Sequence, residues 1–134
     1  MRYLLDSHIL IWTLFSDDRL PTKARNIIND PDNEIFYSAA SVWEIAIKHS
    51  KSPDKMPVTG NDLMNYSDAA GIIPLPISGS HAAAISRLTR NASEPQHNDP
   101  FDKLLIAQAK AEGMILLTHD HLLSGYNEPC VKTV

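Results

Sequence analysis

The sequence lacks a second cysteine, a long apolar run and an excess of positive charge. Cys130 is the only cysteine among 134 residues, so no disulfide can form within the chain, and disulfide-stapled folds are excluded. Nowhere do apolar residues reach the run of about 18 that a transmembrane helix needs. The first apolar stretch breaks off at Asp6, so we expect no signal peptide, no membrane contact and a cytoplasmic protein.

The chain has fewer basic than acidic residues. The chain has 12 Lys and Arg against 16 Asp and Glu, which gives a formal charge of −4. A protein that only coats nucleic acid should be basic, because Lys and Arg make most phosphate contacts. If this chain acts on nucleic acid, another cation has to neutralise the phosphates. Its 43% of hydrophobic residues is enough for a folded core, and the length suits a single domain over residues 1–134.

Apolar segments predict strands that alternate with helices. We expect strands over 2–5, 34–38 and 114–118, helices over 7–15, 21–30, 39–50, 61–70, about 78–90 and 100–112, and loops over 51–60 and 91–98, with further apolar runs at 72–76 and 130–134. The strands are apolar at consecutive positions, which indicates burial on both faces. We therefore predict an α/β protein, a three-layer α/β/α sandwich around a mostly parallel central sheet.

Two aspartates follow two of the predicted strands. Asp6 and Asp120 each come soon after a strand, and in parallel sheets ligands bind beyond the carboxyl ends of the strands. Glu44 and Asp102 interrupt apolar helical stretches, where an acid needs a partner or a cation. Carboxylates gathered at one sheet edge would repel one another unless a divalent cation lay among them. Mg²⁺ and Mn²⁺ prefer such oxygen ligands and can activate water at a phosphodiester.

Each acid also has a purely structural explanation. Asp6 can cap the helix that follows it, and Asp120 can cap the turn that follows it. Glu44 can pair with a lysine one helical turn later. Asp99 can cap the helix that starts at the next residue, a proline, and Asp102 then lies in the first turn, where acids favour the helix dipole. Together these explanations leave two strand-end aspartates in one sheet unaccounted for.

Four segments resemble the successive motifs of a nuclease family. They are residues 4–8 (LLDSH), 38–48 (SAASVWEIAIK), 97–109 (HNDPFDKLLIAQA) and 117–120 (LTHD). In content and order they are similar to the motifs of PIN-domain nucleases, and most of all to those of VapC-type toxins from bacterial toxin–antitoxin pairs. The resemblance runs from residue 3 to about residue 131. It implies a PIN-like α/β/α sandwich, in agreement with the strand pattern.

The resemblance also implies a metal site and an activity. The acids of the family's site correspond to Asp6, Glu44, Asp102 and Asp120, and supporting positions correspond to Asp99, Ser7 and Thr118. The four site acids would bind Mg²⁺ or Mn²⁺ and catalyse RNA hydrolysis, while the two hydroxyls would orient a ligand or a bound water. The chain departs from the pattern at Asn98, where Arg is common, so a local salt bridge or RNA contact is in doubt.

Partners follow from the resemblance as well. It implies an RNA substrate, a cognate antitoxin protein that holds the enzyme inactive, and a homodimer. Trp12 and Phe15 lie three residues apart in a predicted helix, so they can present one aromatic face to a second copy.

Two other interpretations stay open. One is a Mg²⁺-binding phosphoacceptor, or a non-catalytic binding domain, with a flavodoxin-like fold; such domains usually carry a pair of acids after the first strand, where this chain has Asp6 alone. The other is zinc at His119 and His121, although structural zinc sites need four ligands and the chain has no cysteine pair.

Overall fold

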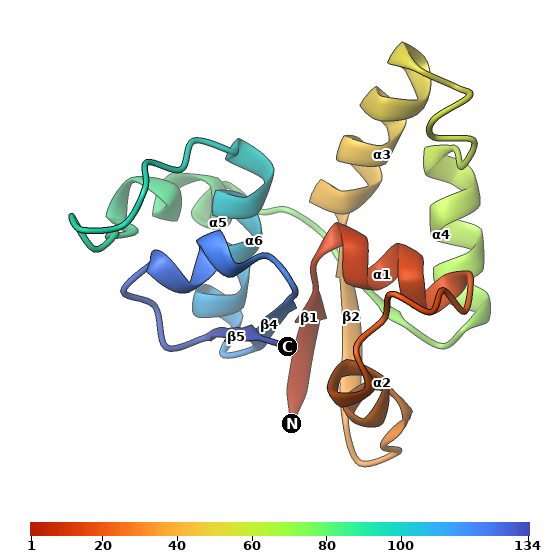
Figure 1. Cartoon of the computed structure of the whole chain (residues 1–134), viewed down its shortest axis with the longest axis horizontal. Coiled ribbons are helices and arrows are strands. Elements are labelled where there is room, and N and C mark those ends of the chain that lie inside the picture. Colours follow the sequence, from red (N-terminus) through yellow and green to blue (C-terminus); the bar gives the residue numbers. More distant parts are fainter.

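A computed structural model describes all 134 residues and contains a five-stranded parallel sheet (Figure 1). The strands are β1 (Arg2–Leu5), β2 (Glu34–Ser38), β3 (Ile73–Leu75), β4 (Ile115–Thr118) and β5 (Val131–Thr133). The helices are α1 (Ser7–Leu14), α2 (Thr22–Asn29), α3 (Ala39–Lys51), α4 (Gly60–Ala69), α5 (Gly79–Ala84) and α6 (Pro100–Glu112), with 3-10 turns η1 (Ile85–Arg87) and η2 (His121–Gly125). None of the helices combines the length and apolar character needed to span a bilayer.

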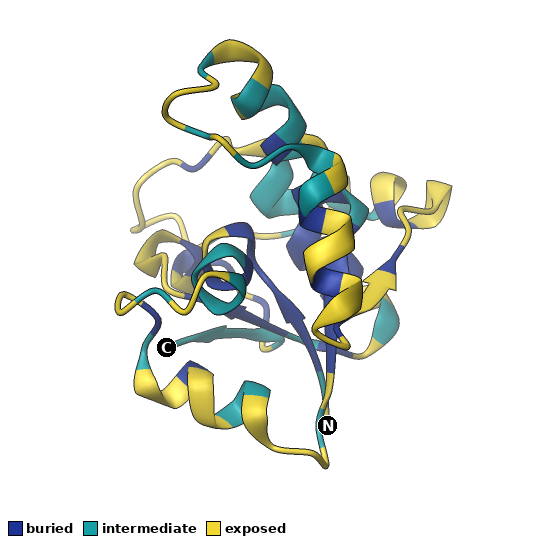
Figure 2. Ribbon diagram, turned by 90° about the vertical axis from the view of Figure 1, so that its right-hand side faces the viewer, coloured by how far each residue is buried: buried dark blue, intermediate teal, exposed yellow.

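Alternate residues of the central strands supply two hydrophobic clusters, one on each face of the sheet. Tyr3 and Leu5 of β1 pack in one cluster with residues of α1 to α4. Leu4, between them, packs in the other cluster with residues of α6, and α5 lies against α6. The central strands β1, β2 and β4 are mostly buried, whereas the edge strands β3 and β5 and the outer surfaces of the helices are more exposed (Figure 2). The three-layer α/β/α sandwich predicted from the strand pattern is therefore confirmed.

The strand order explains why acids far apart in the sequence meet. The order is β3-β2-β1-β4-β5, and all neighbouring strands are parallel. The chain leaves β1 towards β2 and β3 and later returns to β4 on the other side of β1. The direction of winding thus reverses between β1 and β4, and the crevice at the carboxyl ends of such a pair is where parallel sheets bind ligands. Flavodoxin-like sheets have the order 2-1-3-4-5, so the flavodoxin-like fold of that alternative is wrong.

The prediction of a helix over about 78–90 is wrong for the second half of that range. α5 ends at Ala84 and η1 at Arg87, after which Leu88 is extended. Arg90 then forms an isolated antiparallel bridge with Tyr126, and a backbone hydrogen bond joins Asn91 to Gly125. Pairing with a segment distant in sequence therefore ends the helix early. The apolar runs 72–76 and 130–134 contain the edge strands β3 and β5.

Candidate active site

Asp6 lies directly after β1 at the carboxyl edge of the sheet and is 5% exposed. Its backbone N–H donates to the carbonyl oxygen of Leu117 in β4 (3.0 Å). Its Oδ1 accepts the Ile9 N–H (3.1 Å), which caps α1, and its Oδ2 accepts the Thr118 hydroxyl (2.5 Å). Burial raises the pKa of Asp6, although these hydrogen bonds oppose the rise. The expected helix cap is thus present, and the carboxylate is fixed at the edge.

Thr118 joins the two strand-end aspartates. Its hydroxyl donates to Asp6 and also accepts the backbone N–H of Asp120 (3.0 Å). Oδ1 of Asp120 accepts the Leu122 N–H (2.9 Å) and caps η2. One buried hydroxyl on β4 therefore links the residues that follow two neighbouring strands. Thr118 is one of the supporting positions that the resemblance implied, and these are the contacts it makes.

α6 brings a third acid to the same edge. Asp99 caps this helix and accepts the N–H groups of Phe101 (2.9 Å) and Asp102 (3.3 Å), with Pro100 at the first helical position. The cap predicted for Asp99 is therefore present, and the side chain is exposed. Capping at this residue fixes the start of α6, which places Asp102 in the first turn.

Asp102, Asp120 and His97 come together at this edge. One ligand atom from each lies within 4.8 Å of the others. Nε2 of His97 is 3.1 Å from Oδ2 of Asp102. Oδ1 of Asp120 accepts the hydrogen bond that caps η2. The second oxygen of each aspartate is left to bind an ion. His97 begins the segment 97–109 that resembles a family motif, but it is not among the site residues predicted from the sequence.

The electrostatics of the edge favour a cation. Burial, as the largest cause, and the charges of the neighbouring acids together raise the pKa of Asp102 to about 8; the contributing acids are, in order of effect, Asp99, Asp6, Glu44 and Asp120. A carboxyl group with such a pKa is largely protonated at neutral pH, because the other acids disfavour a further negative charge. A divalent cation reverses this preference. The oxygen-rich set of donors therefore fits Mg²⁺ or Mn²⁺.

Glu44 is held apart from the cluster of Asp102, Asp120 and His97. Its Oε1 accepts the Ser7 hydroxyl (2.7 Å), and its Oε2 pairs with Lys48 (2.9 Å). The helical pair expected as the structural explanation of Glu44 is thus present. The Ser7 hydroxyl also lies 2.9 Å from the hydroxyl of Ser41, a residue that sequence analysis missed. This contact joins positions 34 apart, so no local pattern could reveal it.

A pocket of about 270 Å³ adjoins the strand-end aspartates. It is lined by Asp6, His8, Trp12, Arg19, His119 and Asp120. The Trp12 indole stacks on His8 and meets His119 edge-on, each with ring centroids 5.8 Å apart. Phe15 instead packs against Tyr66 of α4 (5.9 Å). Trp12 and Phe15 therefore do not form the shared face that their spacing suggested.

The histidine pair after β4 does not form the metal cluster. His119 and His121 have ring centroids 5.8 Å apart, and Nδ1 of His119 hydrogen-bonds to the Val134 carbonyl oxygen (2.5 Å). The group of possible metal ligands contains His97 and neither of these two residues. Zinc at His119 and His121 is therefore not supported.

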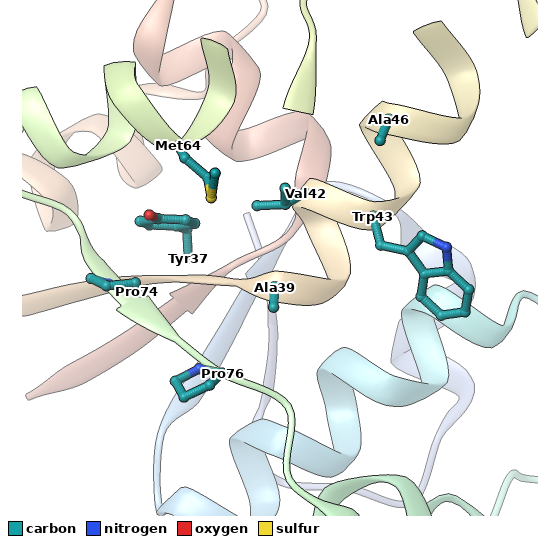
Figure 3. Close-up of a pocket in the computed structure, with 8 residues that line it drawn as sticks. All are labelled: Tyr37, Ala39, Val42, Trp43, Ala46, Met64, Pro74 and Pro76. Carbon is teal, nitrogen blue, oxygen red and sulfur yellow. The ribbon is translucent and has the colours of Figure 1, made fainter. Parts of the chain in front are cut away.

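A larger, apolar groove is formed by residues of β2, β3, α3 and α4. It measures about 470 Å³ and is lined by Tyr37, Ala39, Val42, Trp43, Ala46, Met64, Pro74 and Pro76 (Figure 3). Met64 of α4 and Val42 of α3 lie over the Tyr37 ring, while Trp43 points towards α6. Trp43 is 56% exposed and meets Phe101 edge-on (4.9 Å). Trp43 lines the groove and directly precedes Glu44 in sequence, so the groove and this acid share helix α3.

The raised pKa of Asp102 predicts how stability depends on pH. In the folded protein the Asp102 carboxyl stays protonated up to about pH 8, whereas in the unfolded chain it loses its proton near pH 3.8. Without metal, the free energy of unfolding should therefore fall as the pH rises from about 3.8 to about 8. We expect Asp102→Asn to flatten this fall and to melt above wild type at pH 8. Thermal melting curves of both proteins, recorded in chelator from pH 4 to pH 9, measure this difference.

Asp99→Asn is the matched variant one helical turn away. Asparagine caps a helix about as well as aspartate, so this change should keep most of the cap's contribution to stability. Parallel melting profiles for wild type and Asp102→Asn would contradict the assignment of the raised pKa to Asp102.

Comparison with known proteins identifies the family. A model of the PIN domain matches residues 3–128. Ribonuclease VapC22 of Mycobacterium tuberculosis is 29% identical over 135 residues, an alignment that covers 98% of this chain and 96% of that protein.

Solved structures share the fold. VapBC2 from Rickettsia felis, bound to a DNA fragment from its promoter, matches with a TM-score of 0.69 and 18% identity, covering 100% of this chain and 99% of that one. A toxin–antitoxin complex from Klebsiella pneumoniae matches with a TM-score of 0.61 and 20% identity, covering 98% and 96%. The family match spans β1 to η2 and includes all the acids of the edge. The chain therefore belongs to the PIN domain family.

Proposed function

We propose that this protein is a metal-dependent endoribonuclease and the toxin of a toxin–antitoxin pair. The observation that carries the proposal is the acidic edge, where neighbouring carboxylates contribute to raising the pKa of Asp102 to about 8. The PIN domain match and the similarity to a protein named ribonuclease VapC22 support RNA as the substrate. Residues 1–134 would act as a single domain in the cytoplasm, where RNA is available.

The acids would hold Mg²⁺ or Mn²⁺. Asp102 and Asp120 offer oxygens close together at the edge. Asp6, buried directly after β1, and Glu44, at present paired with Lys48, are the other two candidate ligands. A bound ion of this kind makes water a better nucleophile and stabilises the charge that develops on phosphate oxygens. Thr118 keeps Asp6 and Asp120 in place, and Ser7 orients Glu44. The ion also supplies the positive charge that the composition lacks.

Cleavage should depend on both the cation and Asp102. We expect the purified protein to cleave single-stranded RNA with Mn²⁺ or Mg²⁺ and to stop in excess EDTA, with the fold retained. Asp102→Asn should abolish cleavage. Glu112→Gln, at the other end of α6 and paired with His81, should cleave like wild type. A fluorogenic RNA assay with circular dichroism measures both properties.

Undiminished cleavage in EDTA would overturn metal dependence. Wild-type rates in Asp102→Asn would remove that residue from the site. Loss of cleavage in Asp99→Asn as well as in Asp102→Asn would make Asp99 a functional acid in addition to a cap.

The proposed partner is a small antitoxin protein that binds along α3. One similar structure is described as a toxin–antitoxin complex, and the other as VapBC2 bound to a DNA fragment from its promoter. The apolar groove would take an apolar segment of the antitoxin, and the acidic edge would attract an arginine, which forms strong paired hydrogen bonds with carboxylates. Occupation of both sites at once would block access of RNA and metal.

A charge placed in the groove tests this arrangement. Met64 lines the groove and Asn65, its neighbour on α4, is exposed outside it. When the tagged protein is purified from its native host, we expect wild type and Asn65→Lys to recover a small partner. Met64→Lys should recover about tenfold less of this partner, because burying an unpaired charge costs more than 1.4 kcal/mol. Mass spectrometry quantifies the partner. Equal recovery by the two lysine variants would contradict this site.

We also propose that the chain forms a homodimer through the face around Phe15 and Tyr66. Both rings are about half exposed, at 49% and 47%, although they pack against each other. Light scattering should give twice the 14.9 kDa mass of one chain, and Phe15→Lys should give the monomer. A monomeric wild-type protein at micromolar concentration would contradict the dimer.

A further inference from the structure

We infer that His97 is a positioning residue for Asp102, and that Tyr126 orients His97 for this role. The inference rests on the proposed function, since it concerns the proposed metal site. The imidazole is 9% exposed and lies between the two partners. Its Nδ1 is 2.7 Å from the Tyr126 hydroxyl, and its Nε2 is 3.1 Å from Oδ2 of Asp102.

The chemistry of the groups sets the direction of both hydrogen bonds. An ionised Asp102, the form that binds a cation, can only accept, so Nε2 of His97 carries the hydrogen. Nδ1 is then unprotonated and accepts from the Tyr126 hydroxyl. Both ring nitrogens are used within the protein, which makes His97 a support for the carboxylate and not a ligand. Oδ1 of Asp102 is left to face the ion.

Arg90 holds this pair of rings in place. Its guanidinium lies over the Tyr126 ring, 4.8 Å from the centroid. Its Nε donates to the carbonyl oxygen of Pro95 (2.8 Å), and its Nη1 donates to that of Leu122 (2.7 Å). Arg90 therefore ties the loop that carries His97 to η2, the segment that follows the second aspartate of the cluster. The position of the imidazole is fixed from both sides.

The support matters because a metal ligand has to be held in one orientation. The His97 hydrogen bond fixes Oδ2 of Asp102, in the same group of possible ligands that contains Asp120. Hydrogen-bond partners of metal ligands typically contribute 10- to 100-fold to metal affinity. We expect a loss in this range when the imidazole is removed.

Direct titration of Mn²⁺ into the purified protein, by calorimetry or by electron paramagnetic resonance of free Mn²⁺, tests the role without an activity assay. His97→Ala should weaken Mn²⁺ binding about 10- to 100-fold. His97→Gln can place an amide N–H near the position of Nε2 and should recover part of the loss. Tyr126→Phe keeps the packing of the ring but loses the hydroxyl, so it should give an intermediate loss.

His81 provides a matched control. It is a second buried histidine, 4% exposed, and its Nε2 contacts a carboxylate of α6, Glu112, at 2.8 Å. That contact lies at the other end of α6 from Asp102. His81→Ala should therefore lower the melting temperature and leave Mn²⁺ affinity unchanged.

The outcomes separate this inference from the proposed function. Equal Mn²⁺ affinity in wild type and His97→Ala, or in His97→Ala and His97→Gln, would overturn the positioning role and leave the proposed nuclease standing. Mn²⁺ binding that depends on His97 in a protein that cleaves no RNA would overturn the nuclease and leave the positioning role standing. If His97→Ala fails to fold, unchanged affinity in both His97→Gln and Tyr126→Phe overturns the role.

Discussion

Repulsion among carboxylates at one edge of the sheet is the constraint on which the rest of this structure depends. Parallel strands end at the same edge, so β1 and β4 bring Asp6 and Asp120 together, and the capped start of α6 adds Asp102. Burial and the neighbouring charges then raise the pKa of Asp102 to about 8. A fold that keeps these acids together gives up stability at neutral pH, which is typical of a site built to bind a cation. The hydrogen bonds of Thr118 and His97 hold the acids against this repulsion.

Structural and functional roles coincide in these acids. Asp6, Asp99 and Asp120 each cap a helical segment, and Glu44 pairs with Lys48. A cap uses only part of the hydrogen-bonding capacity of a carboxylate, whose two oxygens together offer about four lone pairs, so it orients the group while lone pairs stay available. The simple explanations of each acid are therefore correct but incomplete. What they omit is the convergence of separate caps at one edge, which only the strand order produces.

Much of this arrangement could be predicted from the sequence, for reasons that are local. Strand periodicity and cap residues are short-range patterns, so the strands at β1, β2 and β4, the start of α6 and the acids that follow strands were all predictable. Contacts between distant segments were not. The hydrogen bond from Tyr126 to His97 joins positions 29 apart, and Trp12 packs with His119 and not with Phe15. These depend on tertiary packing, which spacing along one helix does not reveal.

The central claim, that a divalent cation binds among these carboxylates, is tested most directly by diffraction from crystals soaked in Mn²⁺. Anomalous scattering locates the ion without reference to activity. We predict an anomalous peak at the carboxyl ends of β1 and β4, in coordination distance of oxygens from Asp6, Asp102 and Asp120, with His97 still hydrogen-bonded to Asp102 and outside the coordination sphere. A peak coordinated by His97, or no peak at this edge under conditions in which the protein cleaves RNA, would contradict the account.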